Sequence, residues 1–203
     1  MKRRDTFNIA FAAAAAGSLA STAVQAQQAC PADGTPAQFV PKKPADPKPH
    51  VNDIEKYSKC PYCGMDRKQN HHTRVLIHYS DDLPDGVCSL HCAAISLSIN
   101  IDREPKAIWV ADNAATTEIK PLVEADQAAF LVGSKIQGVM SARSKMAYGN
   151  SDAARVAQAA NGGELAGFDK ALLAAYTDMA QDVSMIRKNR EERRKRAMQQ
   201  KED

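Results

Sequence analysis

The pattern of apolar and polar positions predicts a first group of short elements between residues 73 and 111. The group contains two strands, a helix and a third strand, at 73–79, 87–88, 90–101 and 107–111. Apolar residues cluster in the strands, and in the helix they recur at a spacing of three to four, from Leu90 to Ile101. An Asp-Gly turn joins the first two strands. We therefore expect a ββαβ unit in this part of the chain.

The same order of elements recurs further along. Two strands, a helix and a closing strand are predicted at 129–133, 145–149, 152–160 and 164–168. The helix ends before Gly162 and is expected to place Ala153, Val156 and Ala157 on one face. A last helix, capped by Asp169, passes into a charged tail. The predicted fold class is therefore α+β, with two ββαβ-like halves and a charged C-terminal helix.

Composition divides the chain into four segments. Basic residues precede an alanine-rich apolar run, and small residues stand at 24–26, so residues 1–26 are predicted to be a signal peptide. Residues 27–51 hold six of the ten prolines and predict an extended tether. The body is expected at 52–180, in halves of about 52–115 and 116–180, and the charged helical tail at 181–203.

The signal peptide predicts export to the periplasm or the cell exterior, through the Sec or the Tat route. Cys30 follows the expected cleavage point, but Gln27 stands where a lipoprotein signal needs a large aliphatic residue. Lipid anchoring at Cys30 is therefore not favoured, and neither is membrane association in general.

Charge is distributed unevenly along the chain. The formal net charge is +3, although the tail from Arg187 to Asp203 carries eight basic and four acidic residues. Subtracting this tail and the basic signal peptide leaves about −3 for the rest, so nucleic-acid binding is not favoured. The tail is interpreted as a solvated helix end, with an acidic-partner or membrane-surface contact as the alternative.

Four of the five cysteines lie within residues 60–92 and suggest a metal site. Cys60 and Cys63 form a C-x2-C pair, and Cys88 and Cys92 form a C-x3-C pair. Met65 and His91 beside them add a thioether and an imidazole, and such soft ligands at these spacings can converge on one ion. Cys92 falls in the first turn of the predicted helix, where the helix dipole favours a thiolate.

The cysteine spacing leaves several chemistries open. Disulfides are natural in an exported protein, and a thiol oxidoreductase is a further alternative built on C-x2-C. Among metals, four cysteines suit structural zinc, whereas nearby methionines suit Cu(I). No catalytic triad, phosphate loop or carboxylate pair is evident, so enzymatic activity is not expected. A thiol-dependent enzyme is the reserve hypothesis.

Several motifs resemble those of the NosL family, the accessory proteins of nitrous oxide reductase maturation. They are the sequences CPYCGM, CSLHCAA, AIWVAD, AFLVGS, GVM and DAARVAQAANGGEL, between Tyr57 and Asp178. The CSLHC motif also resembles the TRASH and YHS metal modules.

The NosL resemblance implies a periplasmic Cu(I) chaperone with two ββαβ units, similar in fold to organomercurial lyases. It implies Met140 as a copper ligand, together with Cys60, Cys63 and Met65. The implied partners are nitrous oxide reductase, or another periplasmic copper enzyme, and copper-transport machinery. Residues corresponding to Cys88, His91 and Cys92 are absent from many members, so a second or differently built metal site is also expected.

Overall fold

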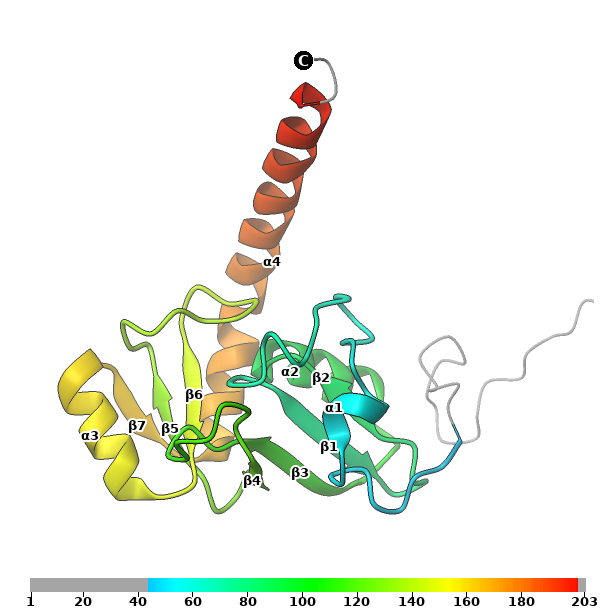
Figure 1. Cartoon of the computed structure of the whole chain (residues 1–203), viewed down its shortest axis with the longest axis vertical. Helices are drawn as coiled ribbons and strands as arrows, with labels where there is room; N and C mark the ends of the chain where they lie inside the picture. The colour runs from blue at the N-terminus through cyan, green and yellow to red at the C-terminus, as the bar shows by residue number, and fades with distance from the viewer. Residues whose placement is uncertain (1–43, 201–203) are drawn as a thin grey trace, which may run out of the picture.

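Two small antiparallel sheets, one of four strands and one of three, form the body of the protein (Figure 1). The computed structural model describes residues 44–200; the predicted signal peptide, Cys30 and most of the tether lie outside the described residues. In the first sheet β1 (Val75–Tyr79) is flanked by β2 (Asp85–Val87) and β3 (Pro105–Ala111), and β4 (Leu122–Glu124) completes the order β2-β1-β3-β4.

The second sheet repeats this arrangement. Strand β5 (Ala129–Val132) pairs with β6 (Lys145–Tyr148) on one side and with β7 (Glu164–Ala166) on the other. In each unit a helix connects the second strand to the third: α2 (Leu90–Ile99) in the first unit and α3 (Ser151–Asn161) in the second. The α+β class and the repeated ββαβ order predicted from the sequence are therefore confirmed.

Alternation along β5 divides the interior between two hydrophobic clusters. Successive residues of a strand point to opposite faces of its sheet. Phe130 accordingly joins the larger cluster, which includes Val75 of β1, whereas Leu131 packs in a smaller cluster with Ala154 of α3. The two sheets therefore share one main core, and α3 covers the outer face of the second sheet.

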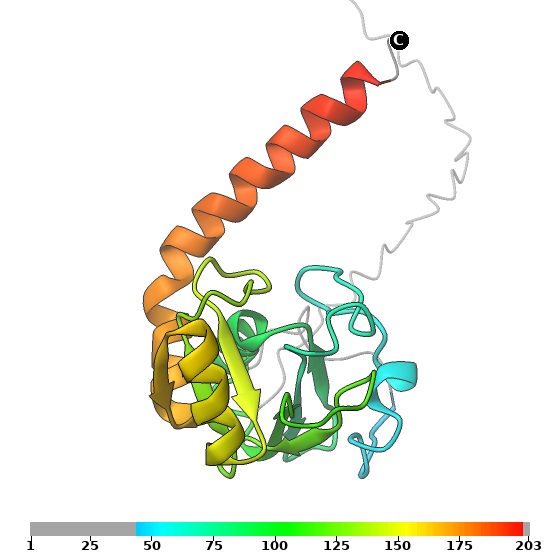
Figure 2. The same cartoon turned by 60° about the vertical axis from the view of Figure 1, so that its left-hand side comes forward.

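The longest element is α4 (Phe168–Gln199), which packs its first half against α2 and β5. Ala171 and Ala175 are fully buried there, because short side chains allow the helix to lie close to the core. From Arg187 onward every described residue is exposed, and the helix extends well beyond the body (Figures 1 and 2). Between residues 44 and 200, no helix is both long enough and apolar enough to span a membrane.

The structure corrects several predicted boundaries and faces. Helix α2 ends at Ile99, and Ile101 is 78% exposed, because Asn100 turns its side-chain amide back onto the carbonyl of Ser96. In α3 the buried residue is Ala154, whereas Val156 is 71% exposed. Alanine at the contact face lets α3 lie close to the sheet. The position of the larger apolar residue, Val156, therefore did not indicate which face of the helix is buried.

Three further differences concern short elements and a helix start. Helix α1 (Asp53–Lys56) and strand β4 were not predicted, because elements of three or four residues show no periodicity. Helix α4 begins at Phe168 after an N-cap at Gly167, which has no side chain to cap the helix, and Asp169 lies in the first turn instead of at the cap.

Candidate metal centre

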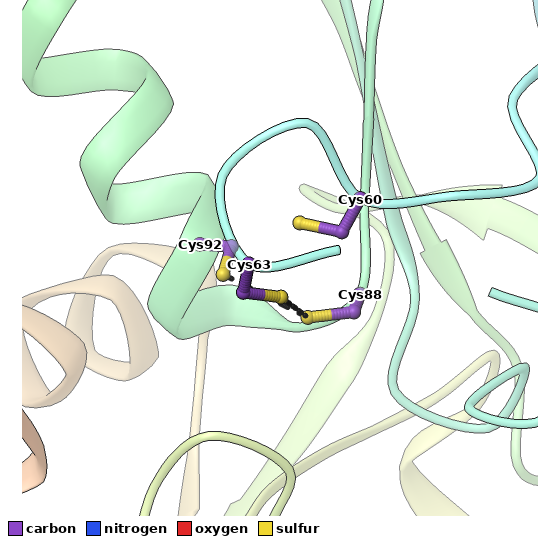
Figure 3. Close-up of side chains that lie close together, drawn as sticks. All are labelled: Cys60, Cys63, Cys88 and Cys92. Carbon is purple, nitrogen blue, oxygen red and sulfur yellow. Dashed lines mark hydrogen bonds between the residues drawn. The ribbon is translucent and has the colours of Figure 1, made fainter. Parts of the chain in front are cut away.

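The four cysteines of the two motifs converge on one point in the first unit (Figure 3). Their sulfur atoms all lie within 4.8 Å of one another, and all four are free thiols. Cys88 Sγ is 3.4 Å from Cys63 Sγ and 3.7 Å from Cys92 Sγ. A tetrahedron of sulfurs with metal bonds of about 2.3 Å has edges of about 3.8 Å. The predicted convergence is confirmed, and the spacing suits a single ion.

A tight loop presents Cys60 and Cys63. The amide of Cys60 donates to the carbonyl of Met65, and the amide of Gly64 donates to the carbonyl of Cys60, both at 2.9 Å. Gly64 has φ +77°, a left-handed conformation that side chains disfavour. The loop therefore closes on itself and turns both sulfurs to the same side.

The second pair is set by the start of α2. Cys88 directly follows β2, Ser89 is the N-cap, and Cys92 lies in the first turn. The Ser89 hydroxyl makes no capping bond and lies 3.8 Å from Cys88 Sγ. The predicted helix start is confirmed, and it places two sulfurs within one turn of backbone.

Arg67 fastens the cysteine loop to the sheet, and the sequence offered no signal for this role. Its guanidinium is fully buried and donates to a carboxylate oxygen of Asp53 at 2.8 Å. It also donates to the main-chain oxygens of Asp53, Tyr57, Val75 and Val87. The guanidinium packs against Gly86, where an added Cβ would lie 2.8 Å from Arg67 Nη1. Segments on both sides of the loop are thereby tied to β1 and β2.

The four thiols perturb one another strongly. Hydrogen bonds from Cys63 and its neighbours lower the pKa of Cys60. A bond with Cys60 acts to raise the pKa of Cys63, but bonds from the other two thiols outweigh it and lower that pKa. The pKa values of Cys88 and Cys92 are raised, first by their bonds to Cys60.

This pattern changes the prediction made for Cys92. The helix N-terminus favours a thiolate, but the hydrogen bonds to Cys60, Cys63 and Cys88 raise the pKa of Cys92. Four thiolates at this spacing repel one another, so all four ionise only with a cation among them. Binding a metal therefore releases protons from the cluster.

One sulfur of the cluster faces a groove. Cys60, Cys88 and Cys92 are buried, whereas Cys63 is half-buried and lines a groove of about 1200 Å³. Met65 and Met140 line the same groove, which lies between the cysteine loop, residues 134–142 and α4. A metal ion entering from this groove meets Cys63 before the deeper sulfurs.

His91 is placed differently. Its Nδ1 lies 3.2 Å from Asp182 Oδ2 of α4, both side chains are buried, and His91 is outside the four-sulfur group. Asp182 also accepts a bond from the amide of Ala142, two residues after Met140. Ligation by His91, Met65 and Met140 remains a prediction, and Asp182 is a site residue that the sequence pattern did not reveal.

Comparison with known proteins gives one family match. The model of the NosL family matches residues 50–174, well over half of the chain. Among solved structures, the chain is similar to the copper chaperone NosL from Shewanella denitrificans, with 21% sequence identity and a TM-score of 0.47. That similarity covers 64% of this chain and 95% of the other. No curated protein matches the chain.

Proposed function

Because the chain belongs to the NosL family, we propose that it is an exported Cu(I) carrier that takes up and releases the ion through the groove. The observation that carries the proposal is the double position of Cys63, which is a member of the thiol cluster and also lines the groove beside Met65 and Met140. A carrier needs such a connection between a binding site and the surface.

The softness of the available ligands supports different roles for the thioethers and the thiols. Cu(I) prefers thiolate and thioether ligands. The thioethers of Met65 and Met140 are weak ligands at the groove, and the thiols of Cys60, Cys88 and Cys92 are stronger ligands behind it. Transfer then proceeds by exchanging one ligand at a time with a partner at Cys63. Carriage requires no bond to be made or broken in an organic substrate, so we assign no enzymatic activity.

Membership of the NosL family and the predicted export signal also support a periplasmic partner that exchanges copper with this protein. We propose that the recipient is nitrous oxide reductase or another periplasmic copper enzyme, and that copper-transport machinery is the source. Delivery would take place in the periplasm.

Competition with a chromophoric Cu(I) chelator, under anaerobic reducing conditions, tests Cu(I) binding. The mature protein is expected to withdraw one Cu(I) per chain from the chelator. Met65→Leu with Met140→Leu should weaken binding about ten-fold, which corresponds to about 1.4 kcal/mol. Met179→Leu is the matched control, since Met179 is half-buried but does not line the groove. Failure to compete, or equal affinities in all three proteins, would contradict the proposal.

A structural zinc site is the second candidate, favoured by the burial and close spacing of the sulfurs. Four cysteines in tetrahedral arrangement are typical of zinc, and proteins with structural zinc unfold when it is removed. The metal content of the purified protein and its circular dichroism after chelation separate the candidates. A Cu(I) carrier stays folded after chelation, whereas tightly held zinc and collapse on its removal would assign the thiols to zinc.

A further inference from the structure

The groove beside Cys63 is basic along its α4 wall. Arg190, Arg193 and Arg196 line this wall, and the acidic residue among the lining side chains is Glu192. Glu192 lies 3.8 Å from Arg196, whereas Arg190 and Arg193 form no ion pair with any residue from 44 to 200. Two guanidinium groups therefore face the groove without a carboxylate partner from the described part of the chain.

The same wall projects away from the body. Residues 187–196 hold seven basic and two acidic side chains, and all are exposed. Figures 1 and 2 show this part of α4 standing clear of both sheets. Cys63, Met65 and Met140 line the same groove. A partner that occupies the groove therefore meets the arginines as well as Cys63.

We propose that the groove is the docking site for an acidic segment of the protein that exchanges Cu(I) with this one. Carboxylates of the segment pair with Arg190 and Arg193, and this pairing brings the partner's metal ligands to Cys63. Complementary charge of this kind steers encounter and fixes orientation. The purpose of the docking rests on the proposed carrier function, but the docking itself is measurable without copper.

A membrane surface fits this feature less well than a peptide segment. Helices that lie on membranes combine a basic face with a broad apolar face. Between Arg187 and Gln199, the apolar side chains of α4 are limited to Ala197 and Met198. The arginines also line a concave groove, which an extended segment can enter and a planar bilayer cannot.

The test uses two synthetic peptides and two charge-reversal variants of the mature protein. One peptide contains four Asp or Glu residues and two Met, and the other carries the corresponding amides. The test variant is Arg190→Glu with Arg193→Glu. The control is Arg187→Glu with Arg194→Glu, which makes the same charge change on residues of the same helix that do not line the groove.

Fluorescence anisotropy at physiological salt measures peptide binding. The acidic peptide should bind the unchanged protein at least about ten-fold more tightly than the amide peptide, and the groove variant should lose about ten-fold in affinity. The control variant should lose no more than about three-fold, because exposed charges away from the contact act weakly through screened solvent. Cu(I) affinity, measured with the chelator, should be the same in all three proteins.

Equal losses in the two variants, or equal binding of the two peptides, would overturn the docking proposal. So would binding to phosphatidylglycerol vesicles, lost in both variants, without binding of the acidic peptide. Peptide binding that depends on Arg190 and Arg193 in a protein that does not bind Cu(I) would support the docking site and contradict the carrier function. The two proposals therefore fail separately.

Discussion

At the scale of single residues, Met140 has a backbone conformation that methionine rarely adopts. Its φ of +61° is left-handed, and Gly138 nearby has no room for a Cβ, which would lie 2.4 Å from the carbonyl oxygen of Ser141. Strained conformations of this kind cost about 1–3 kcal/mol and cluster at functional sites. In this conformation the thioether of Met140 lies in the wall of the groove that Cys63 also lines.

Replacing Met140 separates strain from function. Met140→Gly and Met140→Leu both remove the thioether and should both weaken Cu(I) binding, but the glycine alone relieves the strained φ. We expect the glycine variant to be more stable than the leucine variant by about 1 kcal/mol, because glycine adopts a positive φ without strain. Urea unfolding gives the stabilities. Full Cu(I) affinity in both variants would remove Met140 from the ligand set.

Asp182 joins three parts of the molecule through one buried carboxylate. It accepts bonds from His91 at the start of α2 and from the amide of Ala142 beside the groove, while belonging to α4 itself. Because His91 lies between Cys88 and Cys92, the carboxylate positions the backbone that carries those sulfurs. Asp182 is therefore a positioning residue, which acts on the sulfur cluster through His91.

Asp182→Ala should destabilise the fold by about 1–3 kcal/mol, because it leaves the buried His91 imidazole without its partner. The amide of Ala142 also loses its acceptor, but it is only partly buried and water can replace that bond. Asp182→Asn retains one acceptor oxygen and should lose about half as much. Glu191→Ala, on the exposed part of α4, serves as the control and should leave stability nearly unchanged, because its ion pair with Lys195 is exposed to solvent. Chemical denaturation measures all three. If Asp182→Ala behaved like the control, the carboxylate would have no positioning role.

At the scale of elements, the described end of the proline-rich segment is attached to the first sheet. Asp46 accepts bonds from Lys56 Nζ at 2.8 Å and from the Tyr57 hydroxyl at 2.7 Å. The ring of His50 lies 5.0 Å from that of Trp109, which is half-buried on β3. Burial acts to raise the pKa of Asp46, but the bonds from Lys56 and Tyr57 outweigh it and lower the pKa to about 2.

The lowered pKa gives this attachment a defined pH dependence. The carboxyl has a pKa of 3.8 in an unfolded chain, so its contribution is complete above about pH 4 and is lost as the pH falls toward about 2. Emission from Trp109, the single tryptophan of the chain, should change in this window, and Asp46→Asn should remove that change. Far-ultraviolet circular dichroism provides the control for unfolding. An identical emission titration in both proteins would contradict the assignment.

The sequence predicted the elements and the sulfur cluster better than what holds them in place. Periodic apolar positions predicted both ββαβ units, and the paired cysteine spacings predicted that the four sulfurs lie together. By contrast, Arg67 and Asp182 act through contacts with residues distant in the chain, and a charged residue that becomes buried has the same local pattern as an exposed one. Strand β4 was not predicted for a related reason, because it is defined by its pairing with β3 and not by a pattern of its own.

At the scale of the whole molecule, α4 connects the two units and the groove. Its first half completes the shared core, Asp182 in its middle secures the cysteine motif, and its basic outer half lines the groove. The arrangement places three buried sulfurs behind the half-buried sulfur of Cys63, which lines a groove with a basic wall. Reversible metal transfer needs each of these features.

X-ray absorption at the copper edge shows whether the protein binds Cu(I) through sulfur and whether Cys63 is one of the ligands. The mature protein loaded with one equivalent of Cu(I) is measured beside its Cys63→Ser variant. We expect a coordination shell of sulfur in the unchanged protein and one fewer sulfur in the variant. A shell of nitrogen and oxygen, or a sulfur shell unaffected by Cys63→Ser, would contradict this expectation.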